Sequence, residues 1–189
     1  MKTPRILVFG GSLRAESFNQ KLASLAAEGA REAGAEVTLI TLRDFRMPLF
    51  DEDLETATGM PEPAQQLKAL FAAHEGLIIA SPEYNSTITA ALKNAIDWVS
   101  RTTSPDEPPL AVLRGKSAAI LAASPGGYGG ARSLAQLRPV LENIGITVLP
   151  QQVTIPKAHE AFRPDGQLTD PTQAAAVKAL AASLVAKLA

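Results

Sequence analysis

Residues 5–19 read Arg5-Ile-Leu-Val-Phe-Gly-Gly-Ser-Leu-Arg-Ala-Glu-Ser-Phe-Asn19, and the fold can be predicted outward from this stretch. Its apolar run, residues 6–9, ends at two glycines, which is typical of a strand buried on both faces of a parallel sheet. From Ser17 onward the apolar residues recur with the period of a helix. We therefore expect a strand, a tight turn and a helix in direct succession.

The turn between this strand and helix is rich in hydrogen-bond donors, which come from Ser12, Arg14, Ser17 and Asn19. The free N–H groups at a helix N-terminus attract an anion, and hydroxyls and a guanidinium add further donors. The turn therefore predicts a phosphate site. For single residues a structural role stays open: Ser17 with Gln20 matches a capping box, and Arg14 is also typical of a solvated loop.

Several classes of phosphate site are excluded. The turn is neither G-x-G-x-x-G nor G-x-x-x-x-G-K-[ST], so it lacks the dinucleotide fingerprint and the nucleoside-triphosphate loop. The chain has no cysteine, which excludes the thiolate loop of small phosphatases and arsenate reductases. What remains is a site that binds a phosphate monoester without cleaving it.

Composition narrows the class of protein. With 189 residues and 46% hydrophobic content, the chain suits one globular domain, residues 1–189, with a substantial core. A net charge of −1 gives no basic footprint for nucleic acid and no acidic face for a cationic partner. No stretch approaches a membrane span, and the two histidines are far apart, so we expect no membrane and no metal. The absence of cysteine is compatible with the cytoplasm, where we expect the protein.

Strand and helix patterns alternate along the chain. Strands are expected at 6–9, 36–41, 76–80, 116–123 and 147–149. Helices are expected from 17 to about 34 and at 63–74, 89–99, 131–144 and 171–188. This alternation predicts a doubly wound α/β fold with a five-stranded parallel sheet, order 2-1-3-4-5, and helices on both faces. The long connection 42–61, whose acidic residues suggest a solvated rim, and the segment 158–170 have no regular pattern.

Two further loops would open on the same sheet edge as the phosphate turn. Pro82, Tyr84 and Asn85 follow the third strand and offer a stiff backbone, an aromatic face and an amide, which match the pyrimidine edge of a flavin. A helix-capping turn with a surface tyrosine is the alternative. Glu83 has no base beside it in the sequence, so we interpret it as loop structure or as a hydrogen-bonding contact to cofactor or partner chain.

The third loop, Ser124-Pro-Gly-Gly-Tyr-Gly-Gly130, follows the fourth strand. Its glycines let the backbone approach a ligand closely or adopt positive φ, although glycine-rich turns are common. Trp98 and Tyr128 are more typical of packing or subunit contacts than of cofactor contacts.

Taken together, these motifs resemble the NAD(P)H-dependent FMN reductase family, which includes chromate, quinone and azo-dye reductases. The matching segments are Gly11-Ser-Leu-Arg-Ala-Glu-Ser-Phe-Asn19, Pro82-Glu-Tyr-Asn85, Leu92-Lys-Asn-Ala-Ile-Asp-Trp98, Ser124-Pro-Gly-Gly-Tyr-Gly-Gly-Ala-Arg132, Pro48-Leu-Phe-Asp-Glu-Asp53 and Ala158-His-Glu-Ala-Phe162. The resemblance implies a flavodoxin-like fold that binds one FMN noncovalently, in a dimer or tetramer with the flavin near a subunit boundary. It also implies three groups of contacts: Ser12, Arg14, Ser17 and Asn19 to the phosphate, Pro82, Glu83, Tyr84 and Asn85 to the isoalloxazine edge, and Ser124 with Gly127 closing the pocket.

The chemistry would then belong to the cofactor. Electrons would pass from NADPH or NADH through FMN to a small acceptor (free flavin, quinone, azo compound or chromate) by a ping-pong mechanism, with no catalytic side chain. A flavodoxin-like electron carrier, a non-catalytic flavin-sensing module and a phosphate-binding domain for another small molecule are the alternatives. The sequence leaves open the acceptor, the nicotinamide preference, the subunit number and the roles of segments 42–61 and 154–170.

Overall fold

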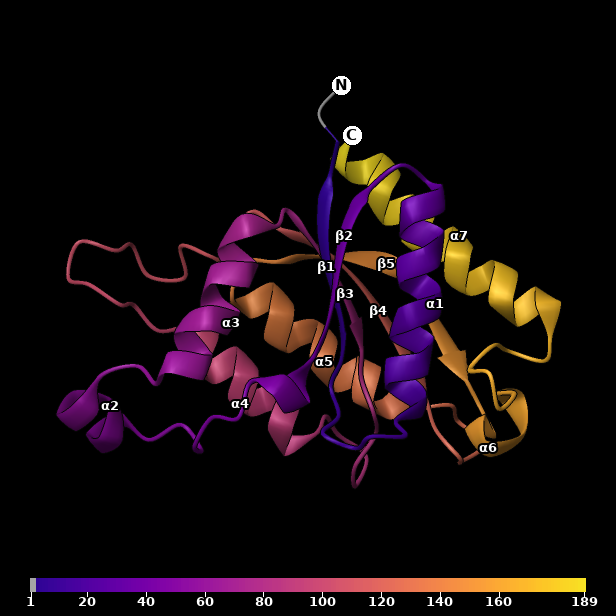
Figure 1. The fold of residues 1–189 in the computed structure, drawn as a ribbon, viewed down its shortest axis with the longest axis horizontal. Helices are drawn as coiled ribbons and strands as arrows, with labels where there is room; N and C mark the ends of the chain where they lie inside the picture. The colour runs from indigo at the N-terminus through magenta and orange to yellow at the C-terminus, as the bar shows by residue number, and fades with distance from the viewer. Residues whose placement is uncertain (1–2) are drawn as a thin grey trace.

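The computed structural model describes residues 3–189 and contains one five-stranded parallel sheet of order β2-β1-β3-β4-β5 (Figure 1). The strands are β1 (Arg5–Gly10), β2 (Glu36–Thr41), β3 (Gly76–Ala80), β4 (Ser117–Ala123) and β5 (Thr147–Ile155). The predicted fold class and strand order are confirmed. All strands except β5 lie within one residue of the predicted bounds.

Helices cover both faces of this sheet. The helices of the described residues are α1 (Phe18–Glu32), α2 (Glu52–Thr58), α3 (Glu62–Ala73), α4 (Ala90–Val99), α5 (Ala131–Asn143), α6 (Ala158–Ala161) and α7 (Pro171–Leu188), with a 3₁₀ turn η1 (Leu42–Asp44). In Figure 1, α1 and α7 lie on one side of the sheet, and α3, α4 and α5 lie on the other. Each side has its own hydrophobic core.

The central strands separate the two cores by alternation. In β1, Ile6 and Val8 join the core under α1 and α7, whereas Leu7 and Phe9 join the core under the opposite helices. Because successive side chains of a strand point to opposite faces, a continuous apolar run is what a strand covered on both faces requires. The β1 run therefore places its carboxyl end, and the turn after it, at the edge of a rigid sheet.

Strand β5 is longer than the sequence predicted. It runs from residue 147 to 155 instead of ending at 149, and its pairing with β4 shifts from Ala118–Val148 to Ile120–Gln152. Two residues along β4 thus face four along β5, and Pro150 lies in the extra length. A proline is tolerated at such a bulge on an edge strand, so the strand continues past Pro150.

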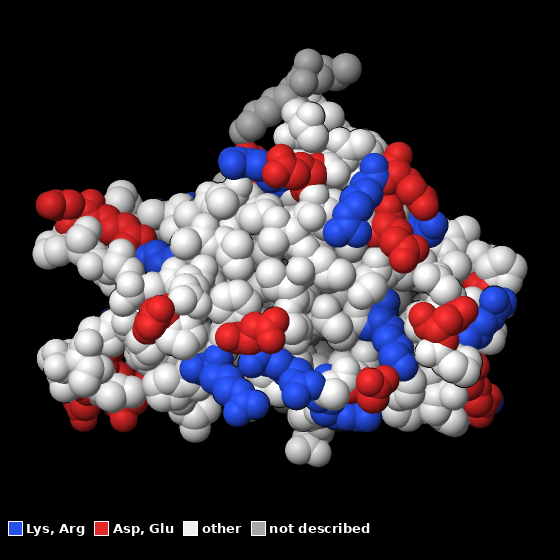
Figure 2. All heavy atoms as spheres, in the orientation of Figure 1, with Lys and Arg blue, Asp and Glu red and all other residues white. Residues whose placement is uncertain are grey.

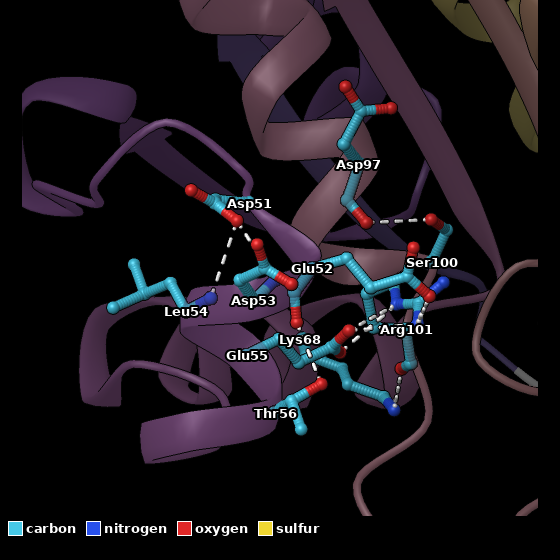
Figure 3. A network of polar contacts seen from close by, with 10 residues as sticks. All are labelled: Asp51, Glu52, Asp53, Leu54, Glu55, Thr56, Lys68, Asp97, Ser100 and Arg101. Carbon is cyan, nitrogen blue, oxygen red and sulfur yellow. Dashed lines mark hydrogen bonds and ion pairs between the residues drawn. The ribbon is translucent and has the colours of Figure 1, made fainter.

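The connection 42–61 is ordered by polar contacts that link it to the start of the 101–115 loop (Figure 3). Asp51 caps α2 by accepting from the backbone N–H groups of Asp53 and Leu54. Glu55 forms an ion pair with Arg101, 2.8 Å from Oε2 to Nη2, which raises the pKa of the guanidinium. The expected solvated rim thus holds for Asp51 and Asp53, whereas Glu55 is half-buried and anchors the segment.

Two more contacts fix this side of the molecule. Trp98 is fully buried and donates its indole N–H to the Pro48 carbonyl at 2.9 Å, so it packs within its own chain. Lys68 forms an ion pair with Glu107 at 2.5 Å. This lysine and a hydrogen bond from the Thr103 backbone lower the pKa of the Glu107 carboxyl to about 2. The proline-rich 101–115 loop is therefore tied to α3.

Segment 158–170 is less irregular than expected. It begins with the short helix α6, and a bridge between Phe162 and Leu168 closes the loop that follows. The Phe162 ring stacks on Phe18 at a centroid distance of 5.7 Å. The segment therefore packs against the first turn of α1.

Candidate cofactor site

The loops after β1, β3 and β4 meet at one hollow with an empty volume of about 340 Å³. Its lining comes from all three loops: Ser12, Arg14, Ser17, Phe18, Asn19, Pro82, Glu83, Tyr84, Ala123, Ser124 and Pro125. Of the ten residues predicted to bind a cofactor, Asn85 and Gly127 lie outside this lining, in the same loops as the others. This convergence is what the strand order predicts, because the first and third strands flank the point where the order reverses.

The β1–α1 turn presents free donors to the hollow. Within the described chain, the backbone N–H groups of Ser17, Phe18 and Asn19 have no hydrogen-bond acceptor. The Ser12 hydroxyl accepts from the Arg14 backbone N–H at 3.2 Å, which shapes the turn. Unpaired N–H groups at a helix N-terminus beside hydroxyls and a guanidinium are a donor set for a phosphate.

The capping box at α1 is only half formed. Ser17 caps the helix by accepting from the Gln20 N–H at 3.3 Å. The Gln20 side chain does not reach back to Ser17: it accepts from the Gly10 N–H at 3.1 Å and donates to the Ile40 carbonyl at 2.9 Å. Gln20 therefore ties together the carboxyl ends of β1 and β2, a role that the pattern of a capping box did not predict.

Asn19 is buried and makes contacts across the site. Its Nδ2 donates to the Ala123 carbonyl at 2.8 Å, and its Oδ1 accepts from the Ala123 N–H at 2.9 Å. The side-chain amide thus pairs with the end of β4 as a neighbouring strand would. Asn19 holds the phosphate turn and the third loop at a fixed separation.

Thr89 is a positioning residue that sequence reasoning missed. It is buried, its hydroxyl donates to the Gly11 carbonyl at 2.5 Å, and its oxygen caps α4 by accepting from the Leu92 N–H at 3.0 Å. Gly11 lies against Leu92, where a Cβ atom would meet the leucine side chain at 3.0 Å. Only the cap signal at Thr89 was readable from sequence, since its contact with Gly11 joins residues far apart in the chain.

The loop after β3 is a tight turn with an exposed tyrosine. Tyr84 and Thr87 exchange backbone hydrogen bonds across Asn85 and Ser86, which both have positive φ, 50° and 67°. Two such central residues are typical of a type I′ turn, and positive φ is strained for serine. Tyr84 is 49% exposed, so its ring stands at the rim of the hollow.

Glu83 is held by a partner that the sequence did not reveal. Its carboxylate forms an ion pair with Arg132 at 2.6 Å and accepts from the Arg132 backbone N–H at 3.2 Å. The guanidinium lies 5.2 Å from the centre of the exposed Tyr128 ring. Glu83 therefore joins the second loop to the start of α5, as the structural interpretation of this residue predicted.

The glycines of the third loop differ in their surroundings. Gly130 has φ +90°, and a Cβ atom there would lie 2.6 Å from the Ala122 side chain, so the fold itself requires glycine. At Gly127 a Cβ atom would meet no protein atom within 4 Å. The packing of the protein therefore does not require glycine at 127, and its contact with a ligand stays a prediction.

These features fit FMN. The donors after β1 suit its phosphate, and the loops after β3 and β4 offer a flat ring an aromatic edge and open backbone. Glu83 is the one carboxylate in the lining of the hollow, and it is engaged by Arg132. The lining contains no histidine, and Tyr84 is its one phenol.

Comparison with known proteins decides the family. The family model for NADPH-dependent FMN reductase matches residues 4–160. The chain belongs to this family. It is 37% identical over 167 residues to an NAD(P)H-dependent FMN reductase of Pseudomonas aeruginosa, covering 88% of this chain and 85% of that protein.

Two further known proteins are also similar to this chain. A quinone reductase of Escherichia coli strain K12 is 36% identical, covering 72% of this chain and 69% of that protein. The structure of FerB, a flavoenzyme NAD(P)H:(acceptor) oxidoreductase from Paracoccus denitrificans, has a TM-score of 0.78 and 27% identity, with 97% and 96% of the two chains covered. The predicted family, enzyme class and FMN dependence are thereby confirmed.

Across residues 3–189, no three His, Asp or Glu side chains are grouped so that they could hold a metal ion. No helix in that range is long and apolar enough to cross a membrane.

Proposed function

We propose that this FMN reductase acts as one FMN-binding domain that passes electrons from NADPH or NADH to a small acceptor, in the class of quinones, free flavins, azo compounds or chromate. The observation that carries the proposal is the meeting of three loops at one hollow with a phosphate donor set on one side and an aromatic rim on the other. The quinone reductase of Escherichia coli supports a quinone as one acceptor.

Ser12, Arg14 and Ser17 would hold the FMN phosphate together with the free N–H groups at the start of α1. Arg14 is exposed and has no ion pair within the described residues, so its charge is available to a ligand. Asn19 lines the same hollow, but its amide is bonded to Ala123. We therefore assign Asn19 the role of positioning the phosphate turn.

The second and third loops would bind the ring. Pro82, Tyr84 and Asn85 would line the isoalloxazine edge, with Glu83 holding their loop through Arg132. Ser124 and Gly127 would close the pocket from the β4 side. The Ser124 hydroxyl accepts from the Gly126 N–H at 3.3 Å, so Ser124 also orders the backbone that would face the ring.

Bound FMN would supply hydride acceptance from the nicotinamide and electron delivery to the acceptor. The protein binds and orients, and no side chain in the hollow needs to move a proton. Because one rim beside Tyr84 opens to solvent, donor and acceptor would use it in turn, which is ping-pong kinetics.

An absorbance spectrum before and after anaerobic addition of NADPH tests the proposal. We expect a flavin spectrum in the purified or FMN-loaded protein and bleaching within seconds, followed by reoxidation on addition of a quinone. Parallel lines in double-reciprocal plots would support ping-pong kinetics. Failure of the protein to bind FMN would refute the proposal, and intersecting lines would refute the shared rim.

We also propose that the enzyme is a homodimer or homotetramer. Leu49 and Tyr128 are 74% and 72% exposed, and large apolar side chains of this kind are common at interfaces. Light scattering coupled to size exclusion would measure the mass, and a monomer would contradict the proposal.

A further inference from the structure

A second hollow lies beside the phosphate turn, at the carboxyl end of β2. It has an empty volume of about 930 Å³ and is lined by Arg14, Ala15, Gln20, Leu39, Ile40, Thr41, Arg43, Asp44 and Arg46. We call it the basic hollow. Figure 2 shows Lys and Arg side chains gathered along the lower edge of this face, below the carboxyl ends of β1 and β2. Three guanidinium groups and one carboxylate give the hollow a net positive charge.

The arginines of the basic hollow have no partner in the protein. Arg101 and Arg132 each form a close ion pair with a glutamate. The guanidinium groups of Arg14, Arg43 and Arg46, by contrast, make no hydrogen bond or ion pair to any residue in the range 3–189, Asp44 included. Unpaired guanidinium groups around one concave surface are a fixed binding set for a phosphate.

A third hollow adjoins the basic one and is mainly apolar. It has an empty volume of about 700 Å³ and is lined by Leu13, Leu42, Arg43, Phe45, Arg46, Met47, Ala91 and Asn94. The Asn94 amide is engaged, because it accepts from the Phe50 N–H and donates to the Pro48 carbonyl. The free polar groups of this apolar hollow are thus Arg43 and Arg46, which it shares with the basic hollow, and guanidinium groups stack well on flat aromatic bases.

We propose that these two hollows bind the adenosine end of NADPH, with adenine in the apolar hollow and the 2′-phosphate between Arg43 and Arg46. Arg14 lines both the basic hollow and the cofactor hollow, so a nucleotide held there lies next to the flavin site. The inference rests on the proposed function and adds a preference for NADPH over NADH. Asp44 is placed at the polar side, where it suits a ribose hydroxyl better than a phosphate.

Binding of adenosine 2′,5′-bisphosphate to the FMN-loaded enzyme tests the site without electron transfer. Calorimetry should show this compound binding at least 10-fold more tightly than adenosine 5′-diphosphate. Arg43→Ala and Arg46→Ala should each weaken its binding roughly 10-fold, since each removes a charge-assisted hydrogen bond. Arg31→Ala, at an exposed arginine near the end of α1, is the matched control and should change nothing.

Steady-state kinetics distinguish binding of the 2′-phosphate of NADPH from binding of the pyrophosphate, which NADPH and NADH share. If the 2′-phosphate is bound, both variants raise the KM for NADPH by a larger factor than the KM for NADH, which shares only the adenine, and leave the Kd for FMN unchanged. Equal losses for NADPH and NADH would overturn the 2′-phosphate assignment in favour of the pyrophosphate, and no loss for either would overturn the site. If NADPH reduces the enzyme equally well in the wild type and in the Arg43→Ala and Arg46→Ala variants, this inference is wrong and the proposed function still holds. One that binds adenosine 2′,5′-bisphosphate but fails to bind FMN supports this inference and contradicts the proposed function.

Discussion

Asn19→Ala should destabilise the FMN-free protein by about 2–6 kcal/mol. The substitution removes both hydrogen bonds from the Asn19 amide to the backbone of Ala123, a residue that is only 3% exposed. An N–H and a carbonyl would then be buried without partners, and each unsatisfied group costs about 1–3 kcal/mol. Alanine is a good helix former at this second position of α1, so helix propensity offsets little of the loss.

The assay is urea unfolding of the FMN-free protein, followed by far-UV circular dichroism. A lower midpoint with an unchanged slope would report a loss of stability in the same unfolding transition. The matched control is Asn143→Ala, at an exposed asparagine that ends α5, and it should change the stability by less than about 0.5 kcal/mol. FMN affinity, measured by flavin fluorescence on both variants, gives the second readout.

The two readouts together decide what Asn19 does. A positioning role predicts a large loss of stability, with a weaker FMN complex as its consequence because the phosphate turn is no longer fixed. A stability within about 0.5 kcal/mol of the wild type together with a large loss of FMN affinity would refute this reasoning. That result would assign the amide to the phosphate instead.

Three further predictions test separate parts of the molecule. Arg14→Ala should raise the Kd for FMN and leave turnover largely recoverable at saturating FMN; no recovery in a folded protein would give Arg14 another role. Gly127→Ala should keep the stability within about 0.5 kcal/mol and weaken FMN binding, whereas Gly130→Ala should lose about 1–3 kcal/mol in urea unfolding, and equal stabilities would contradict the difference in their surroundings. Glu107 has its pKa lowered from 4.5 to about 2 in the folded state, so its stabilising contribution is present above pH 4.5 and is lost as the pH falls toward 2. Glu107→Gln should therefore flatten the decline of the urea midpoint between pH 5 and 2, whereas Asp106→Asn, at an exposed neighbour, should leave it unchanged.

The fold could be predicted from sequence because local patterns and topology agree. The apolar runs of β1, β3 and β4 are continuous, as a doubly covered sheet requires, and each is followed by a helical period. Strand β5 was predicted too short, at 147–149, whereas it continues through Pro150 to Ile155. A bulge on an edge strand depends on the register against β4, which the sequence of β5 alone does not contain.

The position of the site could be predicted from the sequence, whereas the hydrogen bonds and ion pairs between its loops could not. Strand order brings the three loops to one edge, so Ser12, Tyr84 and Ser124 line one hollow as expected. The hydrogen bonds of Asn19 to Ala123 span 104 positions of the sequence, and no local spacing encodes such a contact. The same holds for the contact between Glu83 and Arg132, which are 49 positions apart, so the sequence did not indicate which residue pairs with Glu83.

The polar residues of the site thus divide into two groups with different consequences for the enzyme. Asn19, Gln20 and Thr89 direct their side chains at backbone groups and fix the three loops, whereas the guanidinium of Arg14 is left without a protein partner. A flavin carries its own redox chemistry, so the protein gains most by holding donors rigidly where the phosphate will lie. Substitutions in the first group should therefore lower the free energy of unfolding more than the affinity for FMN. Substitutions of Arg14 should lower the affinity for FMN more than the free energy of unfolding. Acceptor range should then depend on neither group, but on the exposed rim of the hollow beside Tyr84.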